Sequence, residues 1–252
     1  MKRAFVEHTW KEIEALPKDP GVVVLPIGAI EQHGPHLPLC TDAKLAEATV
    51  QRAFEALPAE VAAWYLPVQS YGKSNEHTGY PGTLALSAST LMGVVRDIAV
   101  SLHRAGFRRL MLFNAHGGNK ALLEMMCRDL RAELGLLCFL VQGQVDASRL
   151  PPSEQRFGIH AGTLETALML HLTPGLVRQP LPPARYPRFD SQNFNLTLLP
   201  QVAWLTRDWS PEGHFGNPQA AVAEAGQAWF EEMAHRLAEL IAEASTFEVA
   251  YG

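Results

Sequence analysis

The sequence predicts a layered α/β fold with a mainly parallel sheet. Short runs of Val, Ile and Leu alternate along the chain with stretches of helical periodicity, which is the pattern of parallel βαβ units. The 252 residues suffice for one large domain, so we expect a single domain over 1–252. Apolar residues make up 47% and charged residues 19% of the chain, which supports a large core and argues against disorder.

The bulk composition also narrows the class of protein. The net charge of −5 offers no basic excess for a phosphate backbone, so we expect no nucleic-acid partner. The three cysteines have no paired spacing, which favours a reducing compartment without disulfides. The first 16 residues lack the apolar core of a signal peptide, and the longest apolar runs, 21–30 and 134–141, are too short to span a bilayer. We therefore expect a cytoplasmic protein with no membrane partner.

In the first half of the chain, apolar residues at helical spacing predict helices and β-branched runs predict strands. Ser, Thr and Asp caps and Pro or Gly breakers set the ends of these elements. The predicted elements are a helix over 8–16 with Thr9 as N-cap, a strand over 22–27, a helix from Thr41 or Asp42 to Pro58, a strand over 62–68, and a helix from Ser87 to His103 that Gly106 ends.

The second half continues this alternation and then loses it. The predicted elements are a strand over 109–113, a helix from Asn119 to Leu134, a strand over 136–142, a loop over 148–159, a helix over 163–172 that Pro174 and Gly175 stop, and an amphipathic helix over 218–244 with Pro218 at its first position. The stretch 174–218 is rich in proline and long for a segment without regular structure. Such segments tend to be functional, and we interpret this one as either a subunit contact or a lid.

A polar loop directly after the first strand carries metal-type ligands. Glu31 and His33 lie two positions apart, so their side chains point the same way if the chain stays extended. Asp42 follows at a helix start, and carboxylate oxygen with imidazole nitrogen suits Zn²⁺, Mn²⁺ or Fe²⁺. The alternative is a capped turn with solvated side chains. We interpret His36 in the same loop as a structural histidine or one that supports a ligand.

Three polar loops, 31–42, 70–83 and 114–119, lie just past predicted strand ends. Ligands bind outside the carboxyl ends of parallel strands, so we expect the loops to converge on one face. In the third loop, NAHGGN, His116 lies two residues past a buried strand. The alternatives for this motif are an anion-binding turn at a helix N-terminus and a tight strand–helix connection.

Two further groups of polar residues are candidates for the same face. His160 and Glu165 lie just over one helical turn apart, so they can form a proton shuttle, or Glu165 can bind metal. The alternative is a helix start with a solvated Glu. The loop over 70–87 carries Ser74 and His77 among many hydrogen-bonding groups and suits substrate contact. As a purely structural loop it would hold His77 as a satisfied turn histidine.

Together these motifs resemble the creatininase family of metal-dependent amidohydrolases. The stretches EQHGPHLPLCTD, S-x-E-H with Y-P-G-T, NAHGGN and HAGTLET occur in the family's order and spacing over roughly residues 20–170, with GHFGNP at 213–218 as a weaker continuation. The resemblance implies a three-layer α/β/α domain that assembles as a homo-oligomer, commonly a hexamer. It also implies two divalent metal ions, for which Zn is our first expectation and Mn or Fe the alternatives.

Carried over by position, the resemblance also implies roles for single residues. It suggests Glu31 and His116 as ligands of one metal, His33 as a ligand of the second, Asp42 as the carboxylate that bridges both, His160 as the histidine that handles a proton, and Ser74 as a substrate-contacting serine.

The chain departs from the members that hydrolyse creatinine at two places. Those members carry Tyr and Glu where this chain has Gly117 and Gly118, and that Glu binds the second metal; Glu165 is the nearest substitute. They also carry Trp and Asp where this chain has Arg156 and Phe157. We therefore do not expect creatinine as the substrate. Arg156 is a candidate for binding an anionic group of the substrate, and the alternative is a solvated loop arginine.

The predicted function is metal-dependent hydrolysis of a non-peptide C–N bond in a small molecule, using a metal-activated water. The bond would belong to an amide, a cyclic amide or a formamide. The alternatives are processing of a small peptide, a protein that binds phosphate or a metabolite without catalysis, and a one-metal member with a regulatory role.

Overall fold

The computed structural model describes residues 2–143 and 145–249 and has the predicted three layers. Its centre is a parallel sheet of four strands in the order β2-β1-β3-β4. The strands are β1 (Val22–Ile27), β2 (Ala63–Tyr65), β3 (Arg109–Asn114) and β4 (Leu137–Gln142). Residue 1 and residues 250–252, the ends of the domain predicted over 1–252, lie outside the described residues.

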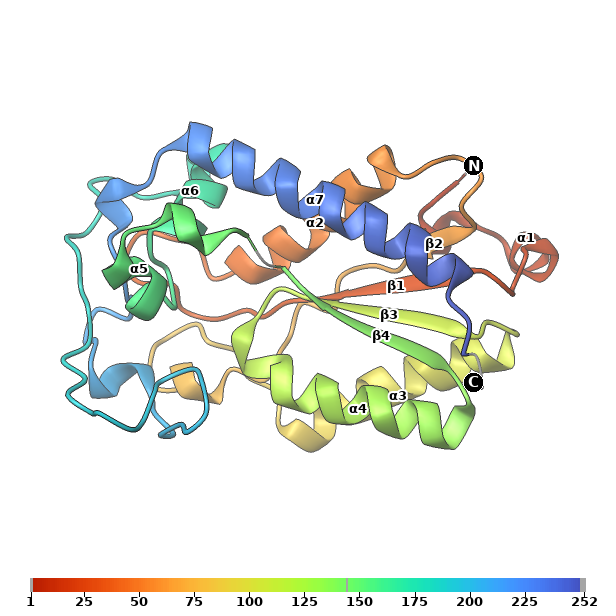
Figure 1. Cartoon of the computed structure of the whole chain (residues 1–252), viewed down its shortest axis with the longest axis horizontal. Coiled ribbons are helices and arrows are strands. Elements are labelled where there is room, and N and C mark those ends of the chain that lie inside the picture. Colours follow the sequence, from red (N-terminus) through yellow and green to blue (C-terminus); the bar gives the residue numbers. More distant parts are fainter. Residues whose placement is uncertain (1, 144, 250–252) are drawn as a thin grey trace.

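Helices cover both faces of this sheet, as Figure 1 shows. One face packs against α3 (Ala88–Arg104) and α4 (Lys120–Leu134), and the other against α2 (Thr41–Ala56) and α7 (Ala223–Thr246). Successive side chains of β1 point to opposite layers, since alternate residues of a strand face opposite sides. A strand buried on both faces must be apolar throughout, which explains the unbroken apolar run that predicted β1.

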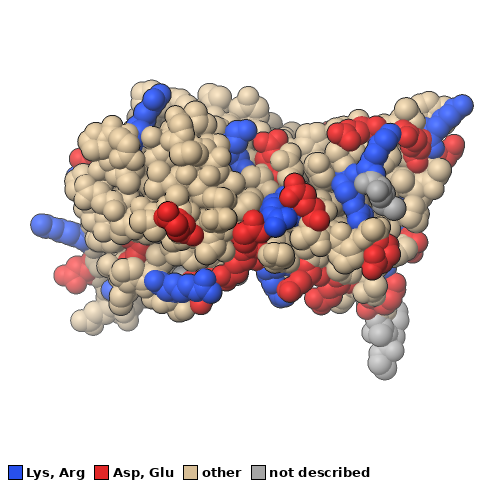
Figure 2. Space-filling view, turned by 90° about the horizontal axis from the view of Figure 1, so that it is seen from above, with Lys and Arg blue, Asp and Glu red and all other residues tan. Residues whose placement is uncertain are grey.

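The remaining elements lie at the two ends of the sheet. They are the helices α1 (Trp10–Ala15), α5 (Pro152–Phe157) and α6 (Thr163–Leu172), and the 3-10 turns Phe5–Glu7, Asn75–His77, Gly117–Asn119, Ala147–Arg149, Pro174–Leu176, Thr206–Asp208 and Pro218–Ala220. Within the described residues, no helix is long and apolar enough to cross a membrane. On the face that Figure 2 shows, the described acidic and basic side chains are interspersed.

Several predicted elements are confirmed at their ends. Thr9 caps α1 in a capping box with Glu12, Ser87 caps α3 by accepting a bond from Thr90, and α6 spans the predicted residues 163–172. These features depend on local hydrogen bonds and breakers, which a sequence displays directly.

The predicted cap of α2 was wrong. Cys40 is the N-cap and makes no side-chain bond, while the Thr41 hydroxyl donates back to Pro38 O at 2.7 Å. The Asp42 carboxylate lies in the first helical turn but faces the histidines His33 and His116. The side chain that looked like a cap is therefore committed to the functional site.

Three other boundaries also needed correction. Strand β2 is only three residues long; beyond Leu66, whose N–H donates to Val24 O, the next bond to β1 comes from Gln69 N to Pro26 O, which interrupts the regular ladder. The loop predicted over 148–159 contains α5, which starts at Pro152 and is too polar to show apolar periodicity. Helix α7 starts at Ala223 rather than Pro218, because Pro218 opens a separate 3-10 turn followed by extended chain at Val222.

Candidate metal centre

The three polar loops converge at the carboxyl ends of β1 and β3, as predicted. Glu31, Asp42 and His116 form the first group of metal-type ligands, with one ligand atom of each within 4.8 Å of the others. Asp42 Oδ2 lies 3.1 Å from His116 Nδ1, and Glu31 Oε2 lies 3.4 Å from His116 Nε2. All three side chains are buried. They come from the loop after β1, the first turn of α2 and the loop after β3.

A second group lies beside the first and consists of His33, His160 and Glu165. Glu165 Oε2 lies 4.0 Å from His33 Nε2 and accepts a hydrogen bond from Ala161 N at 2.5 Å. Asp42 joins the two groups, because its other oxygen, Oδ1, lies 3.1 Å from His33 Nε2. Glu165 therefore points toward the centre rather than into solvent.

Two buried oxygens show that these residues fit a cation. Glu31 Oε2 and Asp42 Oδ2 have no hydrogen-bond partner among the described residues, although both are shielded from water. A buried carboxylate oxygen without a partner is costly, and a divalent ion offsets that cost. Nitrogen and carboxylate oxygen donors are those that Zn²⁺, Mn²⁺ and Fe²⁺ accept.

Burial and neighbouring charges shift the pKa values of these residues. Burial raises the pKa of Glu31 to about 8, although the charge of His116 opposes the shift. Burial lowers the pKa of His116, but the charges of Glu31 and Asp42 outweigh it and raise the value to about 10. A metal ligand must be deprotonated, so metal binding here is coupled to proton release.

His160 is held as a neutral ring with one free nitrogen. Its Nε2 donates to the carbonyl of Gln32 at 2.7 Å, so Nδ1 carries the lone pair. Nδ1 faces the site, 3.6 Å from Glu31 Oε1. Burial lowers the pKa of His160 well below its usual value, and the neighbouring His77 and His33 add to the shift. The next residue, Ala161, has φ 51°, an uncommon conformation that turns its N–H toward Glu165.

The two predicted substrate-contacting residues lie in different surroundings. Ser74 is fully buried, with Oγ 3.4 Å from His116 Nε2. Arg156 lies on the exposed side of α5, where its guanidinium stacks 4.7 Å from the ring of Phe157. Neither residue lines the cavity described below, but Ser74 contacts a residue of the first ligand group and Arg156 does not. His36 also stays outside both ligand groups and bonds to Thr166 Oγ1 at 2.9 Å.

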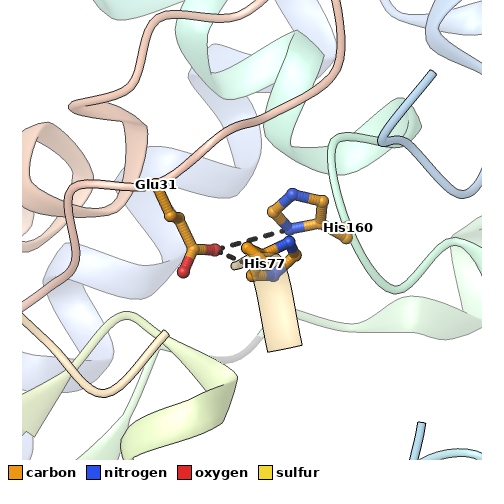
Figure 3. A group of neighbouring side chains, drawn as sticks. All are labelled: Glu31, His77 and His160. Carbon is orange, nitrogen blue, oxygen red and sulfur yellow. Dashed lines mark ion pairs between the residues drawn. The ribbon is translucent and has the colours of Figure 1, made fainter. Parts of the chain in front are cut away.

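Glu76 and His77, predicted only as parts of a loop suited to substrate contact, complete the surroundings of the site. A Cβ atom at Gly118 would collide with the Glu76 carboxylate and the His116 ring, so Glu76 fills the space beside Gly118. Glu76 Oε1 lies 3.7 Å from His116 Nε2. His77 is buried, with Nε2 3.3 Å from Glu31 Oε1 (Figure 3). The available signal was that both belong to the S-x-E-H stretch of a loop expected at this face.

A cavity of about 740 Å³ opens onto these residues. Its inner wall holds metal-type ligands from both groups, and its outer wall is the part of the proline-rich stretch between Leu196 and Trp204. Leu198 and Leu199 are 68% and 88% exposed at this wall. The volume is within the range of small-molecule sites, and the wall gives the cavity an apolar side.

Known proteins resemble the chain in both sequence and structure. The family profile Creatininase, described as creatinine amidohydrolase, matches residues 6–241. The creatinine amidohydrolase of Pseudomonas putida is 36% identical over 214 residues, 75% of this chain and 81% of that protein. The mycofactocin precursor peptide peptidase of Mycolicibacterium smegmatis is 33% identical over 228 residues, 87% of this chain and 84% of that protein.

Solved structures agree with the sequence matches. A creatininase structure described as the Mn form superposes with a TM-score of 0.73 at 29% identity, covering 98% of this chain and 100% of that one. A creatininase variant described as Zn-Zn type has a TM-score of 0.74 at 29% identity, with the same coverage.

Proposed function

The chain belongs to the creatininase family of metal-dependent amidohydrolases, and from this premise we propose that it hydrolyses the C–N bond of a small amide, cyclic amide or formamide. The observation that carries the proposal is the position of Asp42. Its two oxygens face histidines of two different ligand groups, and Oδ2 is buried with no hydrogen-bond partner among the described residues. A carboxylate placed between the two groups would be able to hold a divalent ion in each.

These contacts support a proposed ligand assignment. Glu31 and His116 would hold one divalent ion, His33 and Glu165 the second, and Asp42 both. Glu165 would take the role for which Gly118 has no side chain. Zn is our first expectation for this donor set, with Mn or Fe as alternatives. When bound, such ions supply a water of lowered pKa and polarise a carbonyl group.

The chain's own residues would manage the proton and the substrate. His160 Nδ1 is free to accept a proton from the attacking water and to return it to the departing nitrogen, so that the amide becomes a carboxylic acid and an amine. Ser74 is buried against His116 outside the cavity lining, so it would act on the substrate through the orientation of that ring. Arg156 lies outside the cavity lining, so an anionic group of the substrate would need another partner.

Hydrolysis of a peptide bond is the second candidate, and one observation favours it. The cavity is bounded by the apolar stretch from Leu196 to Trp204, which would suit a peptide side chain. Four of the curated relatives are named as peptide peptidases, including the one from Mycolicibacterium smegmatis. Because the chain is an amidohydrolase, we do not retain the alternative of a phosphate- or metabolite-binding protein.

We also propose that residues 1–252 form one domain, that the protein is cytoplasmic and that it assembles as a homo-oligomer, a hexamer by the family resemblance. The family profile covers most of the chain without a break, which supports the single domain. A mass of one subunit by light scattering at working concentration would contradict the assembly.

Metal removal and reconstitution tests the function. Untagged protein should contain two equivalents of divalent metal per chain and should lose amidase activity after dialysis against a chelator. Adding back Zn²⁺ or Mn²⁺ should restore the activity, since the ligand set suits both ions. The assay should include formamides, cyclic amides and short peptides with apolar residues. Activity that survives complete removal of metal would contradict the proposal.

The Glu165→Gln variant tests the second ion. It keeps the size of the side chain but removes the charge next to His33, so we expect one equivalent of metal per chain instead of two. The measurement is elemental analysis after equilibration with excess metal. Glu224→Gln, a change in the first turn of α7, is a control for the general effect of losing a carboxylate. Two equivalents in Glu165→Gln would remove Glu165 from the ligand set.

A further inference from the structure

The two oxygens of Glu31 face different surroundings. Oε1 lies 3.3 Å from His77 Nε2 and 3.6 Å from His160 Nδ1, as Figure 3 shows. Oε2 has no hydrogen-bond partner and lies 3.4 Å from His116 Nε2. One oxygen is therefore engaged by histidines, and the other is presented to the first ligand group.

The hydrogen-bond network fixes the tautomer of His77. Gln32 Oε1 accepts a bond from Gly34 N at 2.9 Å, so the other end of this amide, Nε2, is the donor. Gln32 Nε2 lies 2.8 Å from His77 Nδ1, which must therefore be the acceptor. A neutral His77 then carries its hydrogen on Nε2, the atom that faces Glu31 Oε1 at 3.3 Å.

Two residues of the proline-rich stretch 174–218 contact this hydrogen-bond network. Thr206, which is fully buried, places Oγ1 2.9 Å from His77 Nδ1, so its hydroxyl shares this nitrogen with the Gln32 amide. Gly213 has φ 84° and packs so closely on the Gln32 amide that a Cβ atom would collide with Gln32 Oε1. The stretch thus contacts His77 Nδ1 directly through Thr206 and packs against the Gln32 amide that sets the tautomer of His77.

We propose that His77 is a positioning residue, and that the chain Thr206–His77–Glu31 decides which oxygen of Glu31 is offered to a metal ion. Carboxylates that bind metals are themselves oriented by such outer hydrogen bonds, and the loss of these bonds weakens metal binding. The inference rests on the proposed function only in taking Glu31 as a ligand. It gives the proline-rich stretch a role at the centre in addition to its place in the cavity wall.

A competing role for His77 is direct metal binding, because ligand atoms of Glu31, His77 and His160 also lie within 4.8 Å of one another. The two roles differ in a measurable way. A positioning residue changes the affinity for metal but not the number of ions bound at saturation. A ligand of a separate ion changes that number.

The test uses substitutions that keep shape and remove hydrogen bonds one at a time. His77→Phe keeps a ring stacked on His160 but has no donor, and His77→Gln restores an N–H donor. Thr206→Val removes only the hydroxyl, and Thr206→Ser restores it. Thr49→Val is the matched control, because Thr49 is equally buried in α2 and its hydroxyl has no partner. Metal affinity by chelator competition, metal content at saturation and the Tm of the metal-free protein are measured for each.

We expect His77→Phe to bind metal about 10- to 100-fold more weakly, which is the usual cost of losing an outer partner. His77→Gln should recover most of the affinity. Thr206→Val should weaken binding roughly fivefold, as expected for one hydrogen bond, and Thr206→Ser should not. Content at saturation should stay at the wild-type value, and Thr49→Val should bind like the wild type.

Wild-type affinity in both His77→Phe and Thr206→Val would overturn the inference, and so would the loss of a whole equivalent at saturation. If His77→Phe does not fold, His77→Gln and the two Thr206 variants test the inference instead. Equal metal affinity in Thr206→Val and Thr206→Ser would then contradict the proposed chain of bonds. A wild-type protein that binds no metal would instead contradict the proposed function. A metal-loaded, active wild type with unaffected variants contradicts the inference alone.

Discussion

The Asp42→Asn variant is expected to lose most of its bound metal and roughly 10³-fold in kcat/KM, because a metal ion contributes several kcal/mol to such transition states. The change is nearly isosteric and keeps one oxygen. It removes the negative charge that lies 3.1 Å from both His33 Nε2 and His116 Nδ1, and it puts an NH₂ group next to one of these rings. Both ligand groups should bind metal more weakly, because Asp42 is the residue that joins them.

Elemental analysis and steady-state kinetics on the same preparation check this result. Glu47→Gln, an exposed change on the same helix, should leave both quantities unchanged. A fully active Asp42→Asn protein with two equivalents of metal would remove Asp42 from the centre and the bridging role with it.

Replacing His160 by Gln should lower kcat by roughly 10²- to 10⁴-fold while both metal ions stay bound, which is the usual effect of losing a general acid–base group. Wild-type His160 acts as a base only when it is neutral. Because burial holds its pKa well below 6.5, the neutral form persists as the pH falls through 6.5, so the acidic loss of wild-type activity should begin only below that pH. The variant should show the lower rate without that acidic limb.

Metal content decides between two roles for this ring. His160 also lies in the group with His33 and Glu165, so a variant that loses one equivalent of metal would identify it as a ligand rather than a proton carrier. His235→Gln, on the exposed side of α7, is the control for a change of histidine far from the cavity. A His160→Gln enzyme with wild-type kcat would contradict both roles.

Much of the candidate site could be predicted because its signals are local. The apolar run of β1 and the polar residues directly after it identify Glu31 and His33 without knowledge of the fold. Because parallel strands end at one edge of the sheet, His116 is then expected on the same face, although it lies 83 positions after His33 in the sequence. The structure brings these residues together with Asp42 and Glu165.

Other features depend on which side chains meet across the fold, and no local pattern displays them. Asp42 has the sequence signature of a helix cap, but its carboxylate contacts two histidines instead. In the sequence, Gly118 stands where a metal ligand is expected, whereas in the structure Glu76 fills the space beside this glycine. Helix α5 is polar and shows no apolar periodicity, so it could not be predicted from the sequence.

The sequence by itself determined the layered fold, the face on which the chemistry lies and the residue types that could bind metal, because periodicity, caps and strand ends are properties of neighbouring residues. Only the tertiary structure decided how each ligand is oriented. His77 bonds to Gln32 and Thr206, which are 45 and 129 positions away, and so holds one oxygen of Glu31. Such contacts form only when the proline-rich stretch packs against the loops at the end of the sheet. The local conformational preferences of the residues therefore do not predict them.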